Sequence, residues 1–218
     1  MKNVIAIDGP GGAGKSTIAK LLAQKLNYIH LDTGAMYRAV TLAALNRNIS
    51  FNSQDKLVDL AQDIDISFNE KGEILLNGQN VSKEIRSTEV NNYVSKTAAV
   101  KGVREVLVKK QQELAVNNKV VMDGRDITTV VLPEAEYKFY LTASLEERAR
   151  RRFEEEKSKG KTADFEEIKA SIARRDRLDS EREHSPLKKA DDAILLDTTN
   201  LSIEEVIAKM MAIIEGEN

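Results

Sequence analysis

The most informative residues of this sequence form a glycine-rich loop near the N-terminus that ends in Lys15 and Ser16. The loop runs Gly9-Pro10-Gly11-Gly12-Ala13-Gly14-Lys15-Ser16 and continues into Thr17. Glycines allow backbone N–H groups to converge on phosphate oxygens without an intervening Cβ atom. At this spacing the lysine reaches the β- and γ-phosphates of a nucleoside triphosphate, and the following hydroxyl ligates Mg²⁺. We therefore expect residues 9–17 to bind a triphosphate such as ATP.

The residues on either side of the loop have the pattern that phosphate binding requires. The apolar run at residues 4–7 predicts a buried strand, and apolar residues at helical spacing predict a helix over residues 18–26. Strand, loop and helix in this order bring the phosphates to the positive end of the helix. An ordinary glycine-rich turn, which is the alternative, does not account for this context.

A later strand end supplies a possible second oxygen group for the metal. The predicted strand at 119–122, with apolar residues at 120–122, is followed by Asp123 and Gly124. Asp123 is a candidate for holding a magnesium-bound water, and shaping the turn is the alternative that stays open. The chain lacks an Asn-Lys-x-Asp tetrapeptide, which a GTPase uses to read guanine, so a GTPase is not expected.

Groups suited to a second, anionic ligand follow two strand ends. In Leu-Asp-Thr-Gly-Ala-Met-Tyr-Arg at 31–38, Thr33 is placed to cap the next helix, and Arg38 lies about one turn inside it. In Asp-Gly-Arg-Asp at 123–126, Arg125 can grip a phosphate bidentately and Asp126 can accept hydrogen bonds from an amino group. Ligands of open α/β sheets bind beyond the carboxyl ends of strands. The alternatives are a solvated arginine at 38 and a salt-bridged helix for the alternating charges at 174–182.

Composition limits the classes of function. The 218 residues carry a formal net charge of -2 and contain no cysteine. Disulfides and thiolate chemistry are therefore excluded, and general binding to nucleic acid or an anionic membrane is not expected. No apolar stretch approaches the length of a membrane span, and the residues before the loop are too few for a signal peptide, so we expect a cytoplasmic protein. We give His30 and His184 structural or surface roles.

The hydrophobic pattern predicts one α/β domain. Strands are expected at 4–7, 28–31, 119–122, 137–141 and 193–196, with helices between them. This alternation predicts a P-loop-type parallel sheet of five strands with helices on both faces. Alternating residues at 65–81 around Asn77-Gly78 predict a small antiparallel insert. Capping-box patterns begin at Ser144 and Ser202.

The ordered motifs together resemble one family, the bacterial cytidylate kinases, which are P-loop nucleoside monophosphate kinases. The resemblance rests on residues 8–17, 31–38 and 123–126, on Val103-Arg104-Glu105, and on 175–182 followed by Ser185-Pro186-Leu187. It covers essentially the whole chain. It implies transfer of phosphate from ATP to CMP and dCMP with Mg²⁺, and we expect a monomer. Thr33 stands where many relatives have serine, and Ser185 replaces an alanine of some relatives.

The resemblance also implies roles for individual residues. Lys15, Arg125 and Arg151 are expected to be catalytic, with Arg148 and Arg152 beside Arg151 in a lid over the donor phosphates, although the run of arginines leaves the essential one open. The expected CMP-binding residues are Thr33, Arg38, Ser95, Arg104, Arg125, Asp126, Arg175, Asp179 and Arg182. Of these, Arg38, Arg125 and Arg182 would hold the phosphate, Ser95, Arg104 and Asp126 would meet the cytosine, and Arg175 and Asp179 would lie near the sugar.

We expect three parts within the single domain 1–218. These are a core at 1–32, 100–147 and 164–218, an acceptor part with the β insert at 33–99, and a lid at 148–163. Two other functions are considered: another small-molecule kinase acting on UMP, AMP or shikimate, and a nucleotide-binding switch without a small acceptor.

Overall fold

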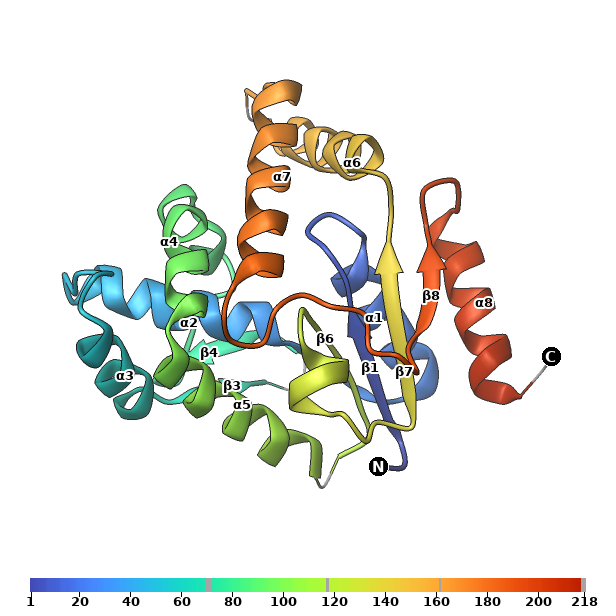
Figure 1. Ribbon diagram of the computed structural model, residues 1–218, viewed down its shortest axis with the longest axis horizontal. Helices are drawn as coiled ribbons and strands as arrows, with labels where there is room; N and C mark the ends of the chain where they lie inside the picture. The colour runs from blue at the N-terminus through green and yellow to red at the C-terminus, as the bar shows by residue number, and fades with distance from the viewer. Residues whose placement is uncertain (70–71, 117, 161, 217–218) are drawn as a thin grey trace.

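A parallel sheet of five strands, in the order β2-β6-β1-β7-β8, forms the centre of the molecule (Figure 1). The strands are β1 Val4–Asp8, β2 Ile29–Asp32, β6 Val120–Gly124, β7 Tyr137–Thr142 and β8 Ile194–Asp197. The structure, a computed structural model, describes residues 1–69, 72–116, 118–160 and 162–216. The predicted five-stranded parallel sheet is confirmed.

Helices cover both faces of this sheet because its strands are apolar on both sides. Ile5 and Ile7 of β1 pack with α1 (Lys15–Leu26) and α8 (Ile203–Glu215). Val4 and Ala6, which point the other way, pack with α5 (Lys101–Val116) and a π-helical turn at Ile127–Val131. Strands buried on both faces read as continuous apolar runs, which is the pattern at residues 4–7.

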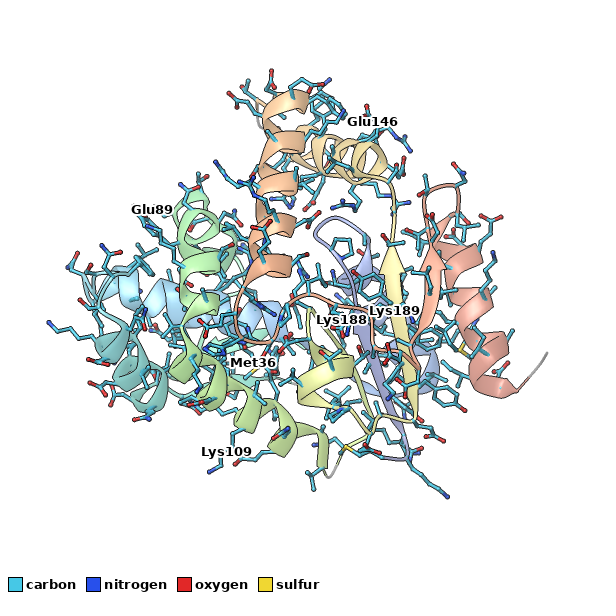
Figure 2. The ribbon with its side chains drawn as sticks, viewed as in Figure 1. Met36, Glu89, Lys109, Glu146, Lys188 and Lys189 are labelled. Atoms are coloured by element: carbon cyan, nitrogen blue, oxygen red, sulfur yellow. The ribbon has the colours of Figure 1, made fainter. Side chains whose placement is uncertain are left out.

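A second group of helices lies beside the sheet. It contains α2 (Thr33–Asn46), α3 (Gln54–Asp63), a 3₁₀ turn (Glu84–Arg86) and α4 (Thr88–Ala99). Their shared core includes Met36 of α2, and α5 joins it through Val103 and Leu107 (Figure 2). Because α5 contributes to two cores, the predicted boundary between the core and acceptor parts stays a prediction.

The predicted antiparallel insert is present as a three-stranded sheet. It consists of β3 (Ile66–Phe68), β4 (Ile74–Leu76) and β5 (Gln79–Asn80), with β4 in the middle. Asn77 and Gly78, which join β4 to β5, have φ angles of 49° and 78°. A two-residue hairpin turn of this kind needs positive φ at both positions, so the Asn-Gly signal is confirmed.

The helices α6 (Leu145–Ser158) and α7 (Phe165–Glu181) extend beyond the carboxyl ends of the strands (Figure 1). Glu146 on α6, labelled in Figure 2, pairs with Lys169 on α7. The rings of Phe153 and Phe165 meet edge to face at 6.0 Å. These contacts join the two helices over the predicted lid region. No helix in the described part of the chain is long and apolar enough to cross a membrane.

The two predicted capping boxes have different outcomes. Ser202 and Glu205 make both reciprocal hydrogen bonds at the start of α8. At the start of α6 the Ser144 hydroxyl accepts from the Glu147 N–H at 3.2 Å, but the Glu147 carboxylate binds arginines of its own helix instead. The pattern that begins at Ser144 therefore forms only half of a capping box.

Candidate active site

The phosphate loop joins β1 to α1, as its sequence predicts. Gly9 has a φ of 147°, and a Cβ built there would lie 1.9 Å from the carbonyl oxygen of Leu141 on β7. Gly14 is the N-cap residue of α1 with a φ of 84°. The loop is thus held against the sheet at its first residue and passes into α1 directly after Gly14, so its backbone N–H groups lie at the positive helix end.

Lys15 is buried within the loop. Its Nζ donates a hydrogen bond to the Pro10 carbonyl oxygen at 2.8 Å. Burial, aided by the nearby charge of Arg125, lowers the pKa of Lys15 to about 7. In the described ranges this ammonium group has no ion-pair partner, so it is a positive group without a matching carboxylate.

Ser16 and Asp123 lie together, as expected for a metal site. The Ser16 hydroxyl donates to Asp123 Oδ2 at 2.8 Å, and His30 Nε2 lies 2.7 Å from Asp123 Oδ1. Burial opposes ionisation of Asp123, but the hydrogen bond to His30 and the charges of His30 and Lys15 lower its pKa below the usual value. Asp123 is therefore an ionised group whose two oxygens are both held in place.

The helix after β2 is capped by Asp32 and not by Thr33. Asp32 has an extended conformation, and its Oδ1 accepts the Ala35 N–H at 3.1 Å. Thr33 is already the first helical residue, and its hydroxyl donates to the Asp123 carbonyl oxygen at 2.8 Å. The predicted cap was wrong by one residue, because the carboxylate just outside the helix reaches the free N–H groups of the first turn. Thr33 instead joins α2 to the end of β6.

Three arginines gather with Lys15 on the acceptor side. Arg125 Nε donates to Asp179 Oδ2 at 3.0 Å, and Arg175 Nε lies 3.9 Å from the same oxygen. Arg38 has no carboxylate partner among the described residues, and it donates to the Ile85 carbonyl and to Asn91. Burial and the charge of Arg175 lower the pKa of Arg38 to about 9. This group holds more positive than negative charge, which suits an anionic ligand.

Arg104 and Asp126 form a buried ion pair, with exposed fractions of 3% and 4%. Arg182 Nη2 lies 3.6 Å from Asp126 Oδ1, and the Arg104 guanidinium lies 5.3 Å from the centre of the Tyr37 ring. Arg182 therefore lies with the pair expected to meet the cytosine, and its role toward the phosphate stays a prediction. Ser95 is half-buried on α4 and makes no hydrogen bond to these residues within the described ranges.

The three predicted lid arginines have different surroundings. Arg148 donates to the Gly11 carbonyl oxygen at 2.8 Å and to Asp176 at 2.5 Å. Arg151 binds Glu147 and, through two nitrogens, Thr198. Arg152 pairs with Glu155 and Glu156 of its own helix. Arg148 is thus already bound to the phosphate loop, whereas Arg151 and Arg152 line the cleft above it.

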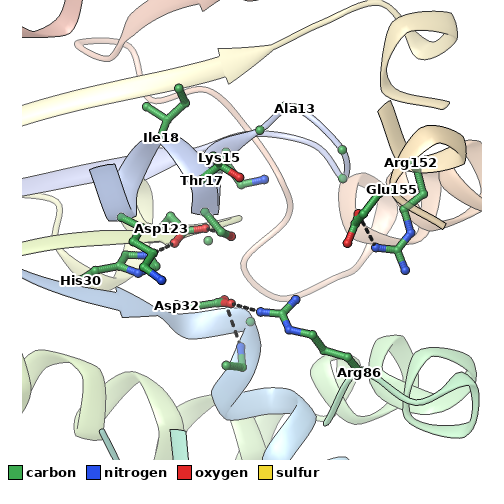
Figure 3. Close-up of a pocket in the computed structure, with 18 of the residues that line it drawn as sticks. Ala13, Lys15, Thr17, Ile18, His30, Asp32, Arg86, Asp123, Arg152 and Glu155 are labelled. Atoms are coloured by element: carbon green, nitrogen blue, oxygen red, sulfur yellow. Dashed lines mark hydrogen bonds and ion pairs between the residues drawn. The ribbon is translucent and has the colours of Figure 1, made fainter. Parts of the chain in front are cut away.

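A single cleft of about 2290 Å³ connects the phosphate loop with the arginine group. Its walls include Lys15, Ser16, Arg38, Arg125, Arg151, Arg152 and Arg175. Figure 3 shows Lys15, Asp123, Arg86 and Arg152 around the cleft, with Arg86 paired to Asp32 and Arg152 to Glu155. A volume this large exceeds the roughly 300–1,000 Å³ of a common ligand pocket, so it can admit two nucleotides.

Two residues of the site carried no specific sequence signal. Asp176 Oδ1 accepts the Gly11 N–H at 3.1 Å, and its other oxygen binds Arg148. It stands in the charged run at 174–182, where an exposed ion pair is the ordinary expectation. The sequence predicts a structural or surface role for His30, whereas the structure places it beside Asp123. A histidine two residues before a strand end has no pattern that reveals such a partner.

Comparisons with known proteins agree with this arrangement. The profile of a family described as cytidylate kinase matches residues 5–216. A protein named cytidylate kinase from Bacillus cereus is 54% identical over 216 residues, which cover 97% of this chain and 96% of that protein. An uncharacterized protein from Eubacterium ventriosum has a TM-score of 0.55 at 12% identity, covering 97% of this chain and 98% of its own. A shikimate kinase from Bacteroides thetaiotaomicron has a TM-score of 0.50 at 14% identity, with the same coverages. At these identities the two structures indicate a shared fold alone.

Proposed function

The chain belongs to the cytidylate kinase family, and from that premise we propose that it transfers the γ-phosphoryl group of ATP to CMP and dCMP, with Mg²⁺ as the metal. The observation that carries the proposal is the single cleft in which the phosphate loop faces Arg38, Arg125 and Arg175. One half of this cleft suits a triphosphate, and the other half suits the phosphate of a second nucleotide. The products are ADP and CDP or dCDP.

The proposed chemistry needs little beyond alignment and charge neutralisation. The phosphate of CMP is already an anion at neutral pH, so its oxygen attacks the γ-phosphorus without a general base. The bond from that phosphorus to the bridging oxygen of ADP breaks in line with the attack. Lys15 and Arg125 would neutralise the charge on the transferred group, and the loop N–H groups would hold the donor phosphates.

The residues present fit Mg²⁺. Ser16 and Asp123 offer oxygen atoms, which are the ligands that this cation prefers. Within the described ranges no three His, Asp or Glu side chains are grouped to hold a metal, which agrees with a site completed by nucleotide phosphates and water. Ser16 would ligate the ion directly and Asp123 would hold one of its waters. Bound there, Mg²⁺ would neutralise charge on the donor phosphates.

The Arg104–Asp126 pair supports a preference for cytosine. The cytosine amino group is a donor that matches the carboxylate of Asp126, and its ring nitrogen and carbonyl are acceptors that match Arg104. Uracil would bring a carbonyl against the carboxylate and leave a buried polar group unpaired. UMP is therefore not favoured as an acceptor, and membership of the cytidylate kinase family does not favour AMP or shikimate.

Release of ADP in the presence of different acceptors tests the proposal. CMP, dCMP, UMP, AMP and shikimate are compared at equal concentration with ATP and Mg²⁺. We expect ADP release to require CMP or dCMP and to be about 100-fold or more less efficient with UMP. Equal efficiency with UMP would remove the base assignment. ATP hydrolysis that no acceptor changes would favour a nucleotide-binding switch instead.

A monomeric state and a cytoplasmic location also stay proposals. Sedimentation analysis tests the monomeric state.

A further inference from the structure

Asp8 is a fully buried carboxylate, 0% exposed, at the point where β1 passes into the phosphate loop. Its hydrogen-bond partners are not on that loop. Asp8 Oδ1 accepts the Ile127 N–H at 2.8 Å, and Oδ2 accepts the Thr128 N–H at 2.7 Å and the Thr128 hydroxyl at 2.6 Å. The side chain therefore holds the start of the π-helical turn that follows β6.

The segment fixed by these bonds contains Arg125 and Asp126. On its near side, Gly124 of β6 is the register partner of Asp8 in the parallel sheet. On its far side, Ile127 and Thr128 are bound by the Asp8 carboxylate. The two residues expected to meet the acceptor nucleotide thus lie on a short loop, and both ends of that loop are held by contacts with Asp8.

The donor side is fixed to the same residue through the backbone. Gly9 directly follows Asp8 and packs so closely on the Leu141 carbonyl that no side chain fits there. Further along the loop, Arg125 Nη2 lies 3.7 Å from the place of a Cβ on Gly11. The phosphate loop and Arg125 therefore lie close to each other. Asp8 is joined to the start of the phosphate loop and also holds the segment that contains Arg125.

We infer that Asp8 is a positioning residue that fixes Arg125 and Asp126 relative to the phosphate loop. This inference rests on the proposed function. Asp8 is buried and is not among the residues that line the cleft, so it acts through the loop it holds. A carboxylate suits three converging donors because it only accepts, whereas the amide of an asparagine would turn an N–H toward one of them. In-line transfer is sensitive to displacements of about 1 Å, which can cost about 100-fold in rate.

Substitutions on both sides of the contact test this role. Asp8→Asn removes one acceptor, and Thr128→Val removes only the hydroxyl donor while keeping the shape of the side chain. Thr128→Ser keeps the hydroxyl and should rescue. Thr129→Val is the matched control, because Thr129 lies on the same turn but its hydroxyl makes only a long bond of 3.5 Å to the Asp126 carbonyl. For each variant kcat, the KM values for ATP and CMP, the preference for CMP over UMP, the calorimetric Kd for CMP and the Tm are measured.

We expect Asp8→Asn and Thr128→Val to lower kcat about 10- to 100-fold and to reduce the preference for CMP over UMP. The KM for ATP should stay within about twofold, because the phosphate loop keeps its own contacts. If both variants lose only thermal stability and match Thr129→Val in kcat and base preference, Asp8 has no positioning role. Should Asp8→Asn fail to fold, Thr128→Val decides alone. A wild-type protein without CMP-dependent ADP release would overturn the proposed function as well, whereas an active wild type with unaltered variants overturns this inference only.

Discussion

At the scale of single residues, the site is marked by positive groups that lack enough negative partners. Lys15 and Arg38 have no carboxylate partner among the described residues, while Arg125 and Arg175 share Asp179. Burial and mutual repulsion lower the pKa of Lys15 and of Arg38. Burying positive charges without paired negative charges is unfavourable in free energy, and an anionic ligand would offset this by supplying the negative charge.

Arg125 is the residue that we expect to matter most for turnover. Arg125→Ala should lower kcat at least about tenfold, because a positive charge that acts beside the Lys15 ammonium on the acceptor side is lost. Arg125→Lys is the matched control, since it keeps the charge without the planar guanidinium. Its kcat should lie between those of wild type and Arg125→Ala. Steady-state assays with CMP measure the effect. An unchanged kcat in the alanine variant would place Arg125 outside the reacting region.

Asp8 should make stability depend on pH in an identifiable way. Burial raises the pKa of Asp8 from 3.8 to about 6, despite the opposing hydrogen bonds from Thr128. The folded carboxyl therefore holds its proton more tightly than the unfolded one. Its contribution is favourable below about pH 4 and is lost as the pH rises through about 6, by about 3 kcal/mol in total.

Unfolding of wild type and Asp8→Asn in urea between pH 4 and 7 isolates this effect. Other carboxylates titrate in both proteins, so the difference in unfolding free energy reports Asp8. As the pH rises from about 4 to about 6, the unfolding free energy of wild type should fall relative to that of Asp8→Asn. A difference that stays constant with pH would mean that Asp8 has an ordinary pKa.

A residue's proposed role can be inferred from its type where the side chain would act near its own place in the sequence. Lys15 and Ser16 follow from the loop motif, which needs no other part of the chain. The cap at Asp32 shows a limit, because Asp32 and Thr33 are both good cap residues and only the backbone conformation distinguishes them. The contact between His30 and Asp123 spans two strands, and no local pattern encodes it.

At the scale of elements, the junction of β1 with the phosphate loop admits only glycine. Gly9→Ala should lower the free energy of unfolding by about 2–4 kcal/mol, since the new Cβ meets the Leu141 carbonyl and the φ of 147° is strained. Gly78→Ala is the control, because its φ of 78° is also positive but nothing lies within 4 Å. We expect about 1 kcal/mol there. Urea denaturation measures both, and equal losses would show that the collision is relieved by local movement.

Periodicity predicted most elements because their burial pattern is local. Read from the sequence alone, residues 88–99 and 101–116 predict two helices, and α4 and α5 have these bounds. The π-helical turn at Ile127–Val131 was not predicted. Its first residues are held by Asp8, which lies 120 residues from Thr128, so the cause of this turn is outside any sequence window.

At the scale of the whole molecule, the large cleft implies closure around two ligands. Water reaching the γ-phosphate would hydrolyse ATP, so α6 and α7 should move toward the acceptor side when both nucleotides are bound. Small-angle scattering with CMP and a non-hydrolysable ATP analogue should give a smaller radius of gyration than either ligand alone. UMP with the same analogue is the matched control. Identical scattering curves in all states would argue that the structure is already closed.

The register of the central strands has a consequence for the order of folding. The core shared by α2, α3, α4 and α5 draws its residues from 35 to 107, a continuous stretch of chain. The pairing of β1 with β6 instead brings together segments at the two ends of that stretch, and contacts of such separation form slowly. We therefore expect contacts among the acceptor-side helices to form before this strand pairing. We expect the phosphate loop to gain its final geometry only after β1 has paired with β6 and β7, so activity should return late in refolding.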